Sequence, residues 1–239
     1  NFNEVLNENL LLKFFEKNEY LKDEFPQDFI YFETYPEDYK SNLPNYPEDT
    51  LKYEGRGGLK DQYEDIESLT LTRNAFNKQF NKFKFTEKFN NLIKEEEKLI
   101  KGKKVVSLMI RCSDHYPGVS SKDILENSIQ SVKNIIDNYD AVFLVTIVKP
   151  FLDRFVELFG DKCIYTDRER FDDDVDWKGG RDMIMTDEEY QIEYQNAFLD
   201  VILASKTDMI IGSSSNMFLA SLCMNPKIPF QIFCNSNGS

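Results

Sequence analysis

The chain has 239 residues, 41% of them hydrophobic and 14% aromatic, enough to bury the core of one large domain or two small ones. Its formal net charge of −13 argues against a nucleic-acid backbone or an anionic membrane surface as the main partner, because both repel an acidic protein. No apolar run reaches the length of a membrane span and no signal-peptide pattern opens the chain, so we predict no transmembrane segment. The first residue is Asn1 rather than Met, so we expect an excised domain with native sequence before it.

Residues 1–100 predict a mostly helical N-terminal region. Apolar side chains recur at roughly helical spacing over residues 4–22, and a phenylalanine stripe from Phe76 to Phe89 lines one side of one or two helices that end near Ile100. Such a stripe is typical of a core. Residues 23–70 show poor periodicity and are rich in Tyr, Pro, Asp and Glu.

From Lys103 onward, short apolar runs alternate with helical patterns. Ser120 and Asp123 predict a helix cap, and Pro150 suits the first turn of a second helix that ends near Gly160. The predicted strands cover residues 105–110, 141–148, 163–165, 209–211 and 228–233, with helices after the first, second and fourth and a long helix from Thr186 before the fourth. Strands that alternate with helices predict a parallel sheet covered on both faces, a Rossmann-like α/β domain.

Two polar clusters follow strands of this sheet. Arg111–His115 comes directly after the first strand, and Gly212–Asn216 lies between the fourth strand and its helix. Small residues and hydroxyls at the start of a helix can cradle a phosphate, although a simple serine cap explains Gly212–Asn216 equally well. Arg111 can grip a ligand or pair with a carboxylate. Because both clusters lie on one edge of the sheet, where open α/β sheets bind ligands, the pair favours a ligand site.

The two clusters carry a resemblance to a known family. Val106–His115, V-S-L-M-I-R-C-S-D-H, resembles the first motif of the fucosyltransferase superfamily: a strand, His-x-Arg-Arg or Arg-Gly, then Ser/Thr-Asp. Phe198–Asn216 is similar to the third motif, in which an Asp-containing helix leads to a strand and a serine pair. Gly160–Asp167 is similar to the region after the second motif. The resemblance covers about residues 101–233, and residues 1–100 carry no signature of this family.

The resemblance implies a GT-B-like fold and an inverting glycosyltransferase. Residues 101–239 would be the Rossmann-like domain that binds the nucleotide-sugar donor, and residues 1–100 the acceptor side or a reduced first domain. The implied donor is a nucleoside-diphosphate 6-deoxyhexose, with GDP-fucose expected, and the acceptor is a glycan or another hydroxyl compound. No metal and no cofactor besides the donor substrate is expected.

The resemblance also assigns roles to single residues. Arg111 matches the arginine that holds the β-phosphate of the donor, and Asp200 matches an aspartate that reads the guanine edge. Ser214, Ser215 and Asn216 span the position of the phosphate-binding serine, with Ser213 beside them as a further donor-binding candidate.

The catalytic base is the least determined part of the expected site. Asp114 matches the acidic residue that faces the sugar, and His115 follows it with a side chain that ordinarily titrates near pH 6.5. Both are candidates for the base, and an ordinary turn with Asp114 holding Arg111 in place remains the alternative.

The sequence departs from the family pattern at several positions. Met109 stands where many members have His, Cys112 stands where several have a second Arg, and Thr146–Lys149 replaces an Asp pair. No glutamate follows Asp114 at the spacing of the base proposed in the α1,6 enzymes. A catalytically silent module that binds a sugar nucleotide or a glycan is therefore the alternative to an enzyme.

Metal-binding patterns are weak in this chain. His115 is the single histidine, and the Asp-x-Asp within Asp172–Asp176 follows Arg168–Phe171 rather than a hydrophobic strand. We predict a solvated acidic loop there, flanked by arginines that pair with it or reach the donor phosphates, Arg168, Arg170 and Arg181. The four cysteines lack metal-ligand spacing and predict free thiols in the cytoplasm or another reducing compartment.

Overall fold

The computed structural model describes residues 14–16, 70, 73–74, 76–78, 80–110, 120–171, 187–213 and 215–234. The chain divides into two compact units, Asn1–Thr86 and Glu87–Ser239. The second unit therefore contains the predicted 101–239 region together with the helix that precedes it. Among the described helices, none has the length and apolar character that crossing a bilayer requires.

The described part of the first unit is organised around phenylalanines. Phe15 forms an antiparallel bridge with Phe85, and its ring lies 6.0 Å from that of Phe80, 5.5 Å from that of Phe83 and 5.1 Å from that of Phe85. The sequence predicts a helix across Phe15, whereas residues 14–16 form a turn and this bridge. Burial against the other aromatic rings outweighs the local helical spacing. The remainder of the helix predicted over residues 4–22 lies outside the described residues.

The second unit is built on a five-stranded sheet. All its neighbouring strands are parallel, in the order β3-β2-β1-β4-β5. The strands are β1 (Val105–Met109), β2 (Ala141–Val145), β3 (Cys163–Ile164), β4 (Met209–Ser213) and β5 (Phe230–Cys234). Strands buried on both faces need continuous apolar side chains, which explains why β1 and β2 are short hydrophobic runs in the sequence. The predicted Rossmann-like parallel sheet is confirmed.

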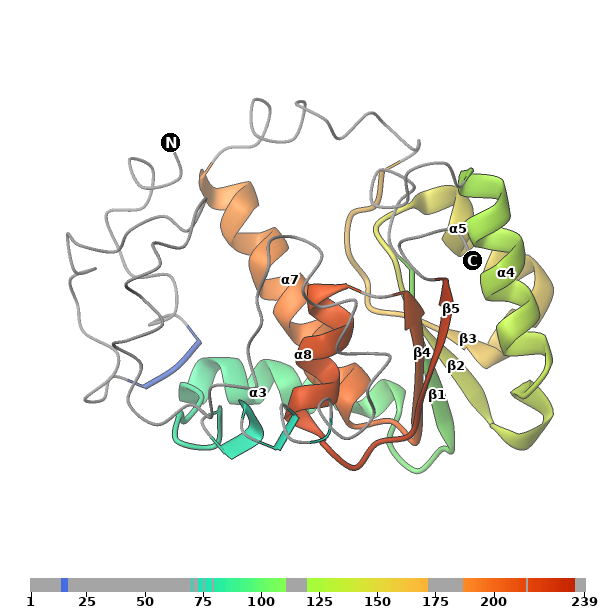
Figure 1. Ribbon diagram of the computed structural model, residues 1–239. Helices are drawn as coiled ribbons and strands as arrows, with labels where there is room; N and C mark the ends of the chain where they lie inside the picture. The colour runs from blue at the N-terminus through green and yellow to red at the C-terminus, as the bar shows by residue number, and fades with distance from the viewer. Residues whose placement is uncertain are drawn as a thin grey trace, which may run out of the picture. The chain divides into compact units, whose positions relative to one another are not determined.

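Helices cover both faces of the sheet (Figure 1). On one face lie α4 (Ser121–Lys133) and α5 (Lys149–Phe159). On the other lie α7 (Asp187–Ser205) and α8 (Asn216–Met224), with α3 (Glu87–Glu96) packed on α7 through Phe rings stacked 5.6 Å apart. The described residues of the second unit also form the short 3-10 helices η4 (Glu97–Leu99), η6 (Ile136–Asn138) and η7 (Gly160–Lys162).

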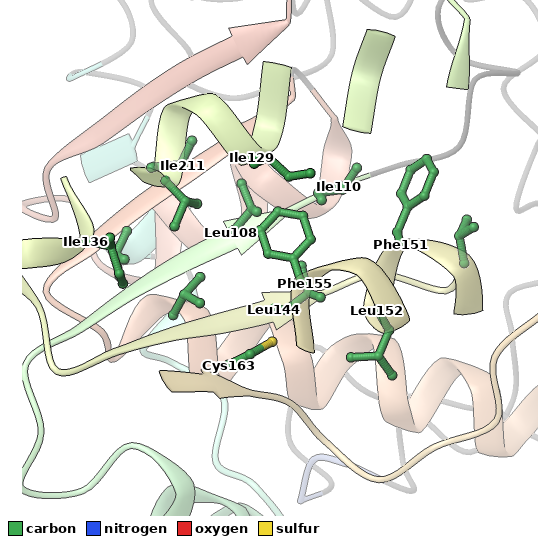
Figure 2. Close-up of a cluster of buried hydrophobic side chains, with 14 of the residues drawn as sticks. Leu108, Ile110, Ile129, Ile136, Leu144, Phe151, Leu152, Phe155, Cys163 and Ile211 are labelled. Atoms are coloured by element: carbon green, nitrogen blue, oxygen red, sulfur yellow. The ribbon is translucent and has the colours of Figure 1, made fainter. Parts of the chain in front are cut away.

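The core between the sheet and helices α4 and α5 holds the strands in place. Leu108, Leu144 and Ile211 point from three neighbouring strands toward Ile129 of α4 and Phe155 of α5 (Figure 2). All five are buried, and each contributes roughly 1.5–3 kcal/mol by leaving water. This packing holds β1, β2 and β4 against the two helices.

The helix ends follow the sequence signals. The Ser120 hydroxyl oxygen accepts a hydrogen bond from the Asp123 backbone N–H at 3.1 Å, so the predicted cap of α4 is confirmed. Pro150 lies in the first turn of α5, where its missing N–H costs no helical hydrogen bond. The cap predicted for α7 at Thr186 lies outside the described residues.

Candidate functional site

The sheet has a topological switch point between β1 and β4. These strands are neighbours, with Met109 paired to Gly212, yet the chain leaves β1 through α4 toward β2 and leaves β4 through α8 toward β5. The two connections diverge to opposite faces, and ligands of open parallel sheets bind beyond the strand ends at such a point. Both predicted polar clusters, Arg111–His115 and Gly212–Asn216, begin there.

Part of the predicted site lies outside the described residues. Ile110 and Ser213 are the last described residues before two gaps, and Arg111, Asp114, His115 and Ser214 lie outside the described residues. Their proposed roles stay predictions. The topology shows that the segments containing them leave neighbouring parallel strands.

Gly212 lets α8 begin directly against β4. A Cβ atom on this residue would lie 2.3 Å from Cδ2 and 2.8 Å from Cε2 of Phe218, whose ring is fully buried. No larger residue fits without displacing this ring. The glycine therefore allows the first turn of the helix to sit at the strand end, where helix N–H groups and the positive end of the dipole face an approaching ligand.

The serines of this cluster play different parts. The Ser215 hydroxyl oxygen accepts from the Phe218 backbone N–H at 3.2 Å, so Ser215 is the helix cap that the sequence left as one alternative. The Ser213 hydroxyl is fully buried at the end of β4 and has no hydrogen-bond partner. Asn216 is the first residue of α8, where backbone N–H groups lack helical acceptors. Ser213 and the first turn of α8 thus remain suited to an anion.

Asp200 of α7 lies in a second polar cluster, which is buried. Its Oδ2 is 2.6 Å from Nη2 of Arg168, and its Oδ1 accepts from the Thr166 hydroxyl at 3.0 Å. The side chains of Asp200 and Arg168 are 1% and 2% exposed. Burial raises the pKa of the Asp200 carboxyl, while Arg168 and the Thr166 hydrogen bond act in the opposite direction. The guanine-reading role of Asp200 stays a prediction.

The loop after β3 holds Arg168 in this position. Phe171 pairs with the segment after β2, where its N–H donates to the Ile147 carbonyl at 2.9 Å. The Arg170 guanidinium donates hydrogen bonds to backbone carbonyls, from Nε to the Thr146 oxygen at 3.2 Å and from Nη2 to the Thr166 oxygen at 2.9 Å. Nη2 of Arg168 shares the Thr146 oxygen at 3.3 Å. Two arginines therefore fasten the loop to the end of β2.

The sequence missed the Arg168–Asp200 pair. The sequence suggested the acidic run that follows, or the donor phosphates, as the partner of Arg168, whereas the described contact joins Arg168 to Asp200, 32 residues later in the chain. One signal was available. Asp200 interrupts the apolar run from Phe198 to Ala204 in a helix that must pack on the sheet, and a buried carboxylate requires a cation or several donors.

Unpaired polar atoms concentrate at the carboxyl edge of the sheet. Among the described residues, the buried side-chain atoms without a hydrogen-bond partner are Nε and Nη1 of Arg168, Oδ2 of Asp200 and the Ser213 hydroxyl. Oδ2 meets Arg168 at ion-pair distance but not in hydrogen-bond alignment. Buried polar atoms in native proteins are nearly always paired, so each exception needs an explanation.

Metal ligands and the buried cysteine Cys163 are the other candidates for chemistry among the described residues. Across the described residues, no three His, Cys, Asp or Glu side chains gather as a metal site would require. Cys163 is buried, and burial raises the pKa of its thiol to about 12, so the nucleophilic thiolate does not form near neutral pH.

Comparison with known proteins gives matches only among solved structures. No family model and no curated protein sequence matches the chain. The fucosyltransferase NodZ from Bradyrhizobium, in its Se-Met form, has 15% identity over 98% of this chain and 81% of that chain, with a TM-score of 0.55. The NodZ α-1,6-fucosyltransferase co-crystallised with GDP has 15% identity over 93% and 77% of the chains, with a TM-score of 0.53.

The extent of these matches varies. Against NodZ soaked with GDP-fucose, the alignment covers 62% of this chain and 46% of that chain, at 16% identity and a TM-score of 0.47. The chain therefore spans about half the length of that enzyme. Identities this low establish the fold rather than the reaction. The chain has a fucosyltransferase-like fold of the GT-B-like α/β class, as the sequence motifs indicate.

Proposed function

We propose that this chain is a fucosyltransferase-like glycosyltransferase that moves a 6-deoxyhexose, fucose, from a GDP-linked donor to a hydroxyl group of a glycan or another acceptor. The observation that carries the proposal is the unpaired, buried Ser213 hydroxyl beside the start of α8, at the switch point of a fucosyltransferase-like sheet. A diphosphate supplies the acceptors that such a hydroxyl and a helix N-terminus lack.

The proposed reaction is a displacement with inversion. The acceptor oxygen attacks the anomeric carbon of the sugar, its proton passes to a base, and the bond from this carbon to the β-phosphate oxygen breaks. Negative charge develops on the departing nucleoside diphosphate. Arg111, which follows β1 in the sequence, and the first turn of α8, which follows β4, would stabilise this charge.

The first test is ligand binding followed by turnover. Because a ligand that binds only the folded state raises the melting temperature, GDP should raise it more than UDP, CDP or TDP at equal concentration. Release of fucose from GDP-fucose, to water or to an acceptor panel, then tests catalysis. GDP binding without any turnover would favour the silent binding module, and no nucleotide binding at all would reject the donor site.

Replacing Arg111 with Ala should weaken GDP binding by about 1.5–3 kcal/mol, because a charge-assisted contact to phosphate is lost. Isothermal titration calorimetry of the folded variant measures this change. The matched control is Arg154→Ala, since Arg154 is an exposed α5 residue that pairs with Glu157. Equal GDP affinity in the Arg111 variant and the control would remove Arg111 from the donor site.

Transfer should continue in excess EDTA, because Arg111 and the helix N-terminus are proposed to neutralise the phosphate charge without a divalent ion. The measurement compares initial rates with EDTA, with Mg²⁺ and with Mn²⁺ after exhaustive chelation. Activity that EDTA abolishes and Mn²⁺ restores would contradict this expectation, and would assign a metal role to the acidic run Asp172–Asp176.

A further inference from the structure

The Arg168–Asp200 ion pair does not use all of its hydrogen-bonding atoms. Two donor nitrogens of Arg168 and one acceptor oxygen of Asp200 lack hydrogen bonds. Arg168 uses only Nη2, which contacts both the Asp200 carboxylate and the Thr146 carbonyl. Its Nε and Nη1 are buried without a partner, and Oδ2 of Asp200 has no aligned donor. Among the described residues, four buried side-chain atoms lack a hydrogen bond, and three of them therefore belong to this pair.

A purely structural arginine in the same loop looks different. Arg170 directs Nε, Nη1 and Nη2 to three backbone carbonyls, those of Thr146, Arg168 and Thr166. All three nitrogens of the Arg170 guanidinium therefore have backbone acceptors, whereas Nε and Nη1 of Arg168, two residues away, have none. Leaving N–H groups of a buried cation unpaired costs free energy, which a ligand that supplies the acceptors would recover.

The chemistry of the unpaired atoms narrows the class of ligand. A phosphate or carboxylate would satisfy Arg168 but, as an acceptor alone, would repel Asp200. A nucleobase edge that carries a carbonyl oxygen beside a ring N–H satisfies both residues. In guanine, O6 lies next to N1–H and the 2-amino group, so an arginine can donate to O6 while a carboxylate accepts from the two nitrogens.

We infer that Arg168 determines base specificity in the donor site, donating through its unpaired Nη1 to the 6-oxo group of a purine whose N1–H and 2-amino group donate to Asp200. This inference rests on the proposed function, which supplies a GDP-linked donor. The position of Arg168 agrees with this inference. Arg168 follows β3, and Ser213 is the last residue of β4 at the same carboxyl edge of the sheet. Because the unpaired atoms are shut off from solvent, entry of the base requires a local rearrangement, and association should be slower than encounter alone allows.

The test compares GDP with two analogues in titration calorimetry. In 6-thio-GDP a weak sulfur acceptor replaces O6, and IDP lacks the 2-amino group. Wild-type protein should bind GDP about tenfold or more tightly than 6-thio-GDP, the loss expected for a hydrogen bond to a charged donor. In Arg168→Lys this ratio should fall toward one while the GDP/IDP ratio persists. Asp200→Asn should reduce the GDP/IDP ratio instead.

The matched control is Arg170→Lys, which has the same charge and lies in the same loop, and it should keep both ratios. Wild-type protein that binds 6-thio-GDP as tightly as GDP would overturn the inference and leave Arg168 as a structural partner of Asp200. The wild-type comparison decides the question even if Arg168→Lys does not fold. Preference for UDP, or no nucleotide binding, would reject the proposed donor together with this inference. Preference for GDP with equal affinities for GDP and 6-thio-GDP would reject the inference alone.

Discussion

Replacing Arg168 with Met should lower the free energy of unfolding by about 3–5 kcal/mol, because the carboxylate of Asp200 would remain buried without its cation. Both side chains are almost fully buried, so water cannot take over the role of the guanidinium. Urea denaturation at pH 7.5 measures the change. The double variant Arg168→Met, Asp200→Leu should recover most of the loss, since it removes both charges from the interior.

The decrease in the free energy of unfolding caused by Arg168→Met should become smaller as the solution becomes more acidic. Burial already raises the pKa of Asp200 above its usual 3.8, and removing Arg168 takes away the largest influence that lowers it. A carboxyl whose folded pKa is raised stabilises the fold below its unfolded pKa and loses this contribution as pH rises through the folded pKa. The deficit should therefore be full at neutral pH and smallest near pH 4.

Arg154→Met is the control for this experiment, because the exposed Arg154–Glu157 pair should contribute less than about 1 kcal/mol at any pH. A similar small effect in Arg168→Met would show that the buried pair contributes little net stability. A deficit that grows toward acid pH would contradict the assignment of Asp200 as the group responsible.

Transfer should fall by about 10²–10⁴-fold when the catalytic base is removed, which we propose is Asp114 or His115. The two residues follow Arg111 by three and four positions, so a loop that brings Arg111 to the β-phosphate keeps them near the sugar. Asp114→Asn and His115→Gln are assayed for transfer, with GDP affinity measured separately. We expect one variant to lose turnover while its GDP affinity stays within a few fold of wild type.

Loss of turnover together with GDP affinity would indicate that the residue positions Arg111 instead of accepting the proton. If both variants retain transfer within a few fold of wild type, the base lies elsewhere. Asp123 and Glu126 are then the next residues to replace, because both belong to α4, which follows the Arg111–His115 segment.

The sheet was predictable because its signals are local. A strand covered on both faces must be apolar at every position, so Val105–Met109 and Ala141–Val145 stand out as short hydrophobic runs. The Ser120 cap and Pro150 depend only on the backbone within one helical turn, and both lie where the sequence placed them. Prediction failed at Phe15, where pairing with Phe85, far along the chain, overrode helical spacing.

The parallel α/β fold, the likeness to fucosyltransferases and a polar cluster following the first strand could all be predicted from the sequence, whereas the strand predicted over 209–211 extends through Gly212 and Ser213 of the second cluster. These properties follow from hydrophobic runs and turn residues that act over a few neighbours. Three features depend on the three-dimensional structure: β1 and β4 are neighbours, Ser215 caps α8 while the Ser213 hydroxyl has no partner, and Arg168 pairs with Asp200. Each of these depends on which strands pair and on which buried groups find a partner, and both are settled by packing between segments distant in the chain.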